Sequence, residues 1–304
     1  MDKLLSRFLS AGLKMPSTAW KDKIHTKCRG QTYPRSDQKR CITPDDKVKW
    51  SVPWPEYNPT EYTSPSLQGQ PWADLEISEQ FAPTFNQMER KDDHVVRNRV
   101  SYVGDYKVIN GYPINPVGRT GIKGRGLLGH WGPNHAADFI VTRWLRDRVN
   151  GQQILNEDSK KPILQFIGIQ RRHGNEWAIP GGMVDAGEEP DHAAQREFLE
   201  EAMNSQELDP KNLEDLMDTV QEMFDRGITI YEGYVDDPRN TDNAWMETTA
   251  INCHSEHGCL EHWPLQAGSD AKQVSWLEIT SSLNLYASHI DLIELVANHH
   301  KAHW

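Results

Sequence analysis

The sequence predicts an α+β protein in which a smaller, irregular N-terminal domain precedes a larger α/β/α sandwich. Proline, tryptophan, tyrosine and glycine concentrate in residues 46–134, where hydrophobic periodicity is weak. Beyond residue 134, strand-like and helix-like segments are mixed without strict alternation. With 304 residues, 37% of them hydrophobic, the chain is long enough to bury a sizeable core.

The first 45 residues are polar and basic, and we expect them to form a poorly ordered lead-in. Residues 1–15, MDKLLSRFLSAGLKM, place Lys3, Arg7 and Lys14 among apolar side chains. This pattern is compatible with organelle targeting, and also with an ordinary surface helix or a linker from a longer protein. Residues 46–134 are predicted to form the N-terminal domain, with short strands and many turns.

Residues 135–304 are predicted to form the larger domain. A first strand is expected at 138–147 and a second, buried strand at 162–172, with Asn150-Gly151 as a turn between them. Helical spacing of apolar residues predicts helices at 191–203, 212–224 and 289–300. Runs rich in β-branched and aromatic residues predict further strands at 228–235, 244–253 and 273–279.

Charge and composition narrow the function classes. The formal net charge is -11, so we do not expect this chain to bind nucleic acid. The sequence contains no run of 18 apolar residues, so no membrane insertion is expected. Four cysteines are few for this length and fit free thiols in a reducing, intracellular compartment, mitochondrial or cytoplasmic.

The segment REFLEE (196–201) gathers acidic residues on one helix face. Glu197, Glu200 and Glu201 stand at i, i+3 and i+4, where like charges repel. A bound divalent cation would turn this repulsion into attraction, with Glu188 near the same site and Arg196 holding one carboxylate by its fork of donors. The glycines of the preceding loop allow a close approach to a ligand. The alternative interpretation is a solvated acidic helix.

This segment resembles the Nudix box. Gly182, five residues, Glu188, seven residues and then Arg-Glu, an apolar residue, any residue and Glu-Glu all match the family pattern. Met203 and Asn204 depart from it, because the family usually has glycine and an apolar residue there. The resemblance implies a Nudix fold and metal-assisted hydrolysis of a nucleoside diphosphate derivative. It implies Mg²⁺, or alternatively Mn²⁺, on Glu197, Glu200 and Glu201.

Three further stretches, 118–144, 231–248 and 285–289, are similar to the ADP-ribose pyrophosphatase branch of that family. The branch includes the C-terminal domain of a melastatin-type cation channel. The resemblance implies cleavage of ADP-ribose to AMP and ribose 5-phosphate, with Asp237, Arg239, Tyr286 and His289 at the ligand. From the residues alone, DDPRN is also a turn with an ion pair, and LYASH is also a packed helix start.

Several interpretations stay open at this point. The base that accepts the proton of the attacking water is Glu200, Glu201 or an acid of a later loop such as Asp270. The chain is a free enzyme, or an ADP-ribose-sensing domain within a channel, with or without hydrolase activity. The Gly-rich segment 118–126 is either a packed interdomain connection or a loop near phosphate. A zinc site formed by Cys253, His254, His257 and Cys259 is disfavoured, because its spacing matches no common structural site.

Overall fold

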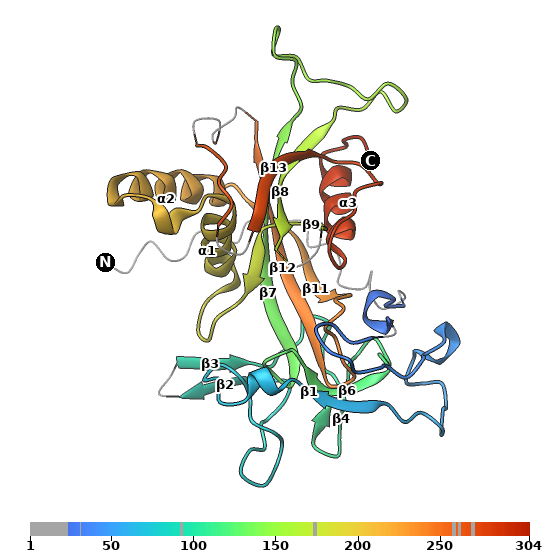
Figure 1. Cartoon of the computed structure of the whole chain (residues 1–304). Coiled ribbons are helices and arrows are strands. Elements are labelled where there is room, and N and C mark those ends of the chain that lie inside the picture. The colour runs from blue at the N-terminus through green and yellow to red at the C-terminus, as the bar shows by residue number, and fades with distance from the viewer. Residues whose placement is uncertain are drawn as a thin grey trace.

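The computed structural model describes residues 24–30, 32–91, 94–172, 175–256, 260, 263–268 and 271–304 (Figure 1). Its centre is a mixed sheet with the strand order β11-β12-β7-β8-β13, to which the short β10 and β9 add at β7 and β8. These strands are β7 (Gly132–Trp144), β8 (Leu164–Arg171), β9 (Trp177–Ala178), β10 (Gly181–Met183), β11 (Ile228–Val235), β12 (Ala244–Ser255) and β13 (Ala271–Glu278). β12 and β7 run parallel along twelve paired residues, and the other pairs are antiparallel.

Helices cover both faces of this sheet. α1 (Pro190–Ala202) and α2 (Pro210–Phe224) lie on one face, and α3 (His289–His299) lies on the other (Figure 1). This arrangement confirms the predicted α/β/α sandwich, and each predicted helix and strand of the larger domain has a counterpart. Among the described helices, none combines the length and the apolar content that a membrane span requires.

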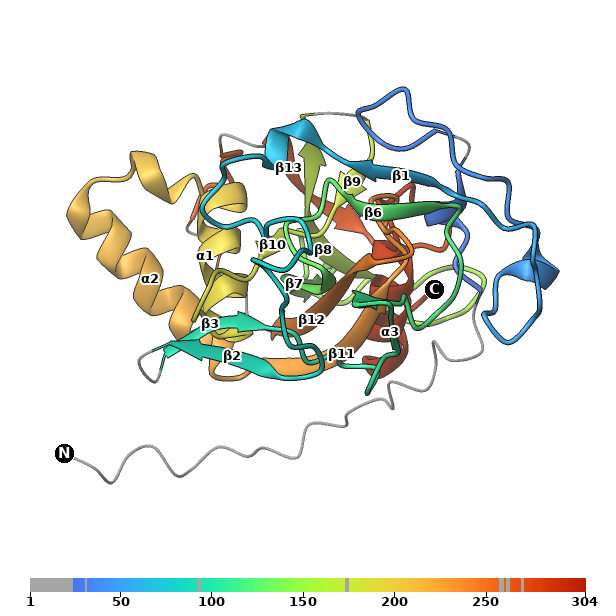
Figure 2. The same ribbon diagram turned by 90° about the horizontal axis from the view of Figure 1, so that it is seen from below.

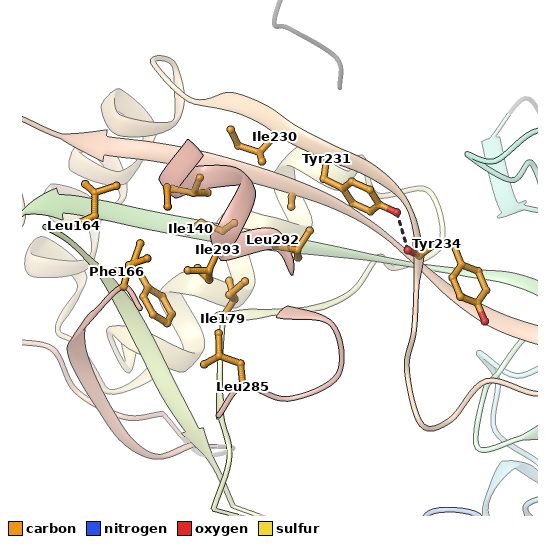
Figure 3. Close-up of a cluster of buried hydrophobic side chains, with 14 of the residues drawn as sticks. Ile140, Leu164, Phe166, Ile179, Ile230, Tyr231, Tyr234, Leu285, Leu292 and Ile293 are labelled. Atoms are coloured by element: carbon orange, nitrogen blue, oxygen red, sulfur yellow. Dashed lines mark hydrogen bonds between the residues drawn. The ribbon is translucent and has the colours of Figure 1, made fainter. Parts of the chain in front are cut away.

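The alternation of side chains along the central strands explains why the sheet needs helices on both faces. On β7, Phe139 and Val141 pack with α1 and α2, whereas Ile140 between them packs with α3. On β8, Phe166 and Ile167 divide between the two clusters in the same way. Figure 3 shows the α3-side cluster, in which Ile140 and Phe166 lie with Ile179, Ile230, Leu285, Leu292 and Ile293.

α1 ends where Met203 and Asn204 depart from the family pattern. Asn204 adopts a left-handed conformation with φ of 47°, which asparagine tolerates better than most residues. Met203 is buried against the sheet. A later segment completes this helix end, because the amides of Gln266 and Gly268 donate to the carbonyls of Ala202 and Glu201. The helix therefore ends at these two residues, and the later segment bonds its last carbonyls.

The N-terminal region consists of short elements, as predicted. β1 (Thr60–Thr63) pairs in parallel with β6 (Ile122–Gly126), and two antiparallel hairpins join β2 (Met88–Lys91) to β3 (His94–Asn98) and β4 (Val108–Ile109) to β5 (Tyr112–Pro113). Single turns of 3-10 helix occur at Lys27–Arg29, Asp45–Lys47 and Pro65–Leu67, and a fourth, Ser205–Glu207, follows α1. In Figure 2 these elements lie against the end of the central sheet.

The prediction of a poorly ordered lead-in through residue 45 is wrong from residue 24 onward. We call residues 24–41 the N-terminal arm, with residue 31 outside the described ranges. His25, Cys28, Tyr33 and Arg40 of this arm are all buried. The His25 ring bridges the Tyr234 hydroxyl at 2.8 Å and the Arg119 carbonyl at 2.9 Å. Sequence periodicity missed the arm because its anchors are isolated side chains that bind distant parts of the chain.

The Gly-rich segment 118–126 is a packed connection. The amide of Thr120 donates to the Asp242 carboxylate at 2.7 Å, and the amide of Gly124 donates to the Asn243 side chain at 2.9 Å. Arg125 lies 5.3 Å from the ring centre of Trp131. The amides of Thr120 and Gly124 thus donate within the protein, so segment 118–126 does not form a phosphate-binding loop.

Candidate active site

A cavity of about 430 Å³ opens between the central sheet, α1 and the start of α3. Six of the predicted site residues line it: Glu197, Glu201, Asp237, Arg239, Tyr286 and His289. Gly181 and Gly182 of the predicted Gly-rich loop line it as well. The sequence analysis did not single out the other lining residues, Arg35, Ala136, Asp138, Arg171, Arg172, Met183, Val235, Met246 and Thr248. One end of the cavity carries the carboxylates of α1, and the other carries arginine and tyrosine side chains from loops.

Arg196 organises the carboxylate end. Its guanidinium donates two hydrogen bonds to Glu188, both at 3.0 Å, and one to Glu197 at 2.8 Å. Its Nη1 also lies 3.9 Å from Glu200. Glu188 and Glu200 do not line the cavity, so Arg196 connects carboxylates outside the cavity with Glu197 inside it.

The glycines of β10 allow α1 to approach the sheet closely. A Cβ atom on Gly181 would lie 2.5 Å from the Ala137 carbonyl oxygen, so this strand pairing excludes a side chain. A Cβ atom on Gly182 would lie 2.2 Å from the Glu197 carboxyl carbon and would displace that side chain. The Gly181 amide donates to Glu201 at 3.0 Å and fixes its direction. These glycines therefore allow a close approach to β7 and α1, and the predicted close approach to a ligand stays a prediction.

The carboxylates of this end differ in the direction of their pKa shifts. Burial raises the pKa of Glu197 above its usual value, although the hydrogen bond from Arg196 opposes the rise. Burial also acts on Glu188, but there the Arg196 hydrogen bonds outweigh it, and the pKa is lowered. The pKa of Arg196 is raised, chiefly by its hydrogen bonds to Glu188. Arg196 thus stays charged and keeps Glu188 ionised.

The carboxylates at this end have the chemistry that a divalent metal ion requires of its ligands. Carboxylate oxygens are the ligands that hard cations prefer, and Arg196 is shared by more carboxylates than its single charge can balance. In this conformation, no three histidine, cysteine, aspartate or glutamate side chains within the described ranges converge closely enough to coordinate one ion. In this conformation Glu197 accepts a hydrogen bond from Arg196 through Oε1, and Glu201 accepts one from Gly181 through Oε2.

Asp237 and Arg239 form an ion pair at the opposite end. Arg239 donates to the two Asp237 oxygens through Nε and Nη2, both at 2.8 Å, and through its backbone amide at 2.7 Å. Asp237 is only 2% exposed. Burial tends to raise the pKa of Asp237, but the charge and hydrogen bonds of Arg239 lower it overall. DDPRN is thus a turn, as its composition indicates, but the carboxylate of its ion pair is buried, and both partners line the cavity.

Tyr286 and His289 complete this end from the start of α3. The Tyr286 hydroxyl lies 3.3 Å from Asp237, and burial together with that carboxylate raises the pKa of the phenol to about 12. The Ile179 amide donates to Nδ1 of His289 at 3.0 Å. Burial lowers the pKa of His289, so the ring is neutral with its proton on Nε2, which lies 3.9 Å from Asp138.

Sequence analysis missed a group of arginines that faces this cavity. Arg171 and Arg172 lie at the end of β8, and the Arg171 guanidinium stands 4.1 Å from the ring centre of Tyr286. Two consecutive arginines after a buried strand, just before the Gly-rich loop, were the available indication. Arg35 belongs to the N-terminal arm, and no sequence pattern connects it with the box.

Two further sequence hypotheses have different outcomes. Asp270, considered as the proton acceptor, lies outside the described residues, as do His257 and Cys259 of the disfavoured zinc site. Cys253 and His254 point to opposite faces of β12. Cys253 packs with the α1 and α2 cluster, whereas His254 contacts His300 at 4.5 Å between ring centres.

Cys28, Cys41 and Cys253 are free thiols, as expected.

Comparisons with known proteins agree with this geometry. The model of the NUDIX domain matches residues 137–293, and the model of the NUDT9-like N-terminal domain matches residues 43–132. The chain is 50% identical over 300 residues to "ADP-ribose pyrophosphatase, mitochondrial" of Rattus norvegicus, covering 97% of this chain and 84% of that protein.

Two other relatives differ in how much of their own length this chain covers. "Putative nudix hydrolase 6" of Caenorhabditis elegans is 46% identical over 282 residues, covering 91% of this chain and 98% of that protein. "Transient receptor potential cation channel subfamily M member-like 2" of Nematostella vectensis is 46% identical over 280 residues. That match covers 90% of this chain but only 18% of the channel. With an intact box on a matching fold, the chain belongs to the NUDIX family as a Nudix hydrolase with a NUDT9-like N-terminal domain.

Proposed function

We propose that this Nudix hydrolase cleaves ADP-ribose to AMP and ribose 5-phosphate through attack of water on the diphosphate. The observation that carries the proposal is a single cavity with a carboxylate end and an arginine-tyrosine end. ADP-ribose combines a diphosphate, which needs cations, with ribose and adenine groups, which need hydrogen bonds and aromatic faces. The name of the rat relative, which covers nearly all of this chain, supports the same substrate.

The divalent metal ion of this family is proposed to be Mg²⁺, with Mn²⁺ as the alternative, held by Glu197, Glu200 and Glu201. When bound, such an ion neutralises charge on the diphosphate and lowers the pKa of a coordinated water. Arg196 keeps the box together by binding Glu188 and Glu197 at the same time. Glu188 therefore acts on the reaction through Arg196, as a positioning residue.

The opposite end is proposed to hold the nucleoside or ribose part of the substrate. Arg239 is fixed by Asp237, so its remaining edge is presented to the cavity in one orientation. Tyr286 offers an aromatic face and a neutral hydroxyl, and His289 offers a donor at Nε2. Arg171 and Arg172 also line the cavity and supply positive charge for the diphosphate.

The base is the part of the proposal with several candidates. Glu201 lines the cavity, Glu200 does not, and Asp270 lies outside the described residues. The geometry favours Glu201 as the proton acceptor in this conformation. We expect the side chain that accepts the proton to lie within hydrogen-bond reach of the attacking water once substrate is bound.

Product analysis tests the function directly. The purified chain is incubated with ADP-ribose, with Mg²⁺ and then with a chelator, and the products are separated by chromatography. We expect AMP and ribose 5-phosphate that appear only with metal. Other nucleoside diphosphate derivatives such as NADH and diadenosine polyphosphates, added at the same concentration, measure the preference.

A second candidate function is ADP-ribose sensing within a cation channel, which the similarity to the Nematostella channel favours. Saturable binding of ADP-ribose without turnover would support this function and would contradict the proposed hydrolase. Turnover favours the enzyme, because binding alone does not require the carboxylates of α1.

We also propose a domain division at about residue 134 and an intracellular location, either mitochondrial or cytoplasmic. The two family models meet near that residue, at 132 and 137, although β7 already begins at Gly132. The rat relative is named as mitochondrial. Imaging of a C-terminal fluorescent fusion distinguishes the compartments, and limited proteolysis with mass spectrometry locates the domain division.

A further inference from the structure

We propose that Arg35, carried by the N-terminal arm, is a substrate-binding residue that binds the diphosphate of the substrate at the mouth of the cavity. The proposal rests on the proposed function, because it assigns a residue to the same substrate. It concerns a part of the chain outside both the box and the matched NUDIX domain. In Figures 1 and 2 the arm, drawn in blue, lies at the end of the molecule that carries β1 and β6.

The arm is attached to the loop that holds Asp237 and Arg239. The carboxylate of Asp236 accepts hydrogen bonds from three consecutive backbone amides of the arm, those of Thr26 at 2.6 Å, Lys27 at 2.8 Å and Cys28 at 3.0 Å. Asp236 is buried, so these bonds are shielded from water. The first part of the arm is therefore fixed directly beside Asp237.

Tyr33 and Arg40 fix the second part of the arm to the same loop. The Tyr33 hydroxyl donates to the Arg239 carbonyl at 2.6 Å and accepts from the Leu127 amide at 2.8 Å. Arg40 donates to the carbonyl of Asn240 at 3.0 Å, and to that of Pro238 at 2.7 Å. The arm thus holds the backbone on both sides of Arg239. A segment fixed in this way has a defined position relative to the cavity.

Arg35 lies at the tip of a tight hairpin between these anchors. The Tyr33 amide donates to the Gln38 carbonyl at 2.9 Å, and the Ser36 hydroxyl donates to the Tyr33 carbonyl at 3.1 Å. Arg35 itself adopts φ of 54°, in the left-handed region that disfavours a large side chain. Its side chain lines the cavity although the residue is exposed. A long cationic residue at such a position, beside a substrate cavity, is the kind of outlier that indicates function.

The charge of Arg35 is available for a ligand. Arg239 is bound to Asp237, and Arg171 stacks on Tyr286, but no hydrogen bond or ion pair joins Arg35 to any residue in the described ranges. A guanidinium fork matches two phosphate oxygens, so the ligand group that Arg35 would bind is anionic. The chain as a whole is acidic, with a formal net charge of -11. The diphosphate is the anionic part of the proposed substrate, and Arg171, Arg172 and Arg35 all face the same cavity.

The test replaces Arg35 by glycine. Glycine adopts the left-handed conformation without strain, so Arg35→Gly removes the guanidinium and keeps the hairpin. Lys160→Gly is the matched control, because Lys160 is also an exposed cation with a left-handed φ, 56°, and it does not line the cavity. We expect Arg35→Gly to raise KM for ADP-ribose about tenfold, the size of one lost charge-assisted hydrogen bond, with kcat little changed. Lys160→Gly should leave both constants unchanged.

Two further measurements keep the outcomes distinct. Raising the salt concentration should raise KM of the wild type and narrow its difference from Arg35→Gly, because the lost contact is electrostatic. Arg35→Lys, which keeps charge without the fork, should give an intermediate KM. Equal KM values for wild type and Arg35→Gly would overturn the role of Arg35 while the proposed hydrolase stands. If the wild type binds but does not hydrolyse ADP-ribose, the proposed function fails, and titration calorimetry on the same variants still decides the role of Arg35.

Discussion

The two ends of the cavity are built in different ways. The carboxylate end comes from one continuous stretch, residues 181–201, in which β10 and α1 are joined by a short loop. The arginine-tyrosine end combines the end of β8, the 236–240 loop and the start of α3, and the N-terminal arm adds Arg35 to the lining of the cavity. A local motif therefore fixes the proposed catalytic groups, whereas long-range packing assembles the proposed binding groups. Mutations at the carboxylate end should therefore change mainly kcat, and mutations at the arginine-tyrosine end should change mainly the affinity for ADP-ribose.

The largest effect is expected at the carboxylate end. Replacing Glu200 and Glu201 together by glutamine should lower kcat by about a hundredfold or more, because two negative charges for the metal are lost. The fold should survive, since repulsion on α1 is relieved. Product formation measures kcat, and a thermal melt measures stability. Glu222→Gln on the exposed face of α2 is the control, and wild-type turnover in the double variant would contradict the assignment.

The opposite end should affect binding. Arg239→Ala should weaken ADP-ribose binding about tenfold or more in titration calorimetry, because a fixed guanidinium is lost. It should also destabilise the fold by about 3 kcal/mol, because Asp237 stays buried without its partner. Adding Asp237→Asn to this variant should recover the melting temperature but not the affinity. Unchanged affinity in Arg239→Ala would remove this residue from the site.

A third prediction tests how the carboxylate helix is supported from outside the box. A Cβ atom on Gly268 would lie 1.9 Å from the Glu200 carbonyl oxygen, so Gly268→Ala must displace either the loop or the end of α1. We expect kcat to fall several-fold and stability to drop by about 1–3 kcal/mol, the usual cost of overpacking. Gly30→Ala, where the nearest atom is 3.9 Å from the added Cβ, is the control. A normal kcat in a destabilised Gly268→Ala would show that α1 tolerates the shift.

The smallest effect concerns the contact between the N-terminal region and the sheet. Asp242 accepts from the Tyr57 hydroxyl at 2.7 Å and from Thr120, and burial raises its pKa to about 6. The folded state therefore binds a proton on Asp242 that the unfolded state has released above about pH 4. Its contribution to stability is complete below that pH and is lost as the pH rises through about 6.

Asp242→Asn removes this titration. Urea unfolding between pH 4 and pH 7 should show a smaller loss of stability with rising pH in the variant than in the wild type. Parallel curves for the two proteins would mean that Asp242 keeps an ordinary pKa in the fold. Because Asp242 does not line the cavity, the ratio of product formation to folded protein should be the same in both.

Much of the fold was predictable because its elements have strong local periodicity. Phe198 and Ala194 on α1, and Leu216 and Val220 on α2, recur at helical spacing and are all fully buried. The arm was not predictable in this way. Its anchors are single contacts between residues that are about 200 positions apart, such as Tyr33 with Arg239 and Thr26 with Asp236. Only folding shows whether such groups meet.

By itself, the sequence determined the carboxylate face of α1 and the larger domain's order of helices and strands. These follow from spacing within a single element, since residues three and four apart on a helix share a face whatever surrounds them. The tertiary structure decided that Asp237 is buried against Arg239, that Glu188 binds Arg196, and that Arg35 lines the cavity. The physical reason is that burial, desolvation and contacts between distant residues exist only once separate segments pack against one another.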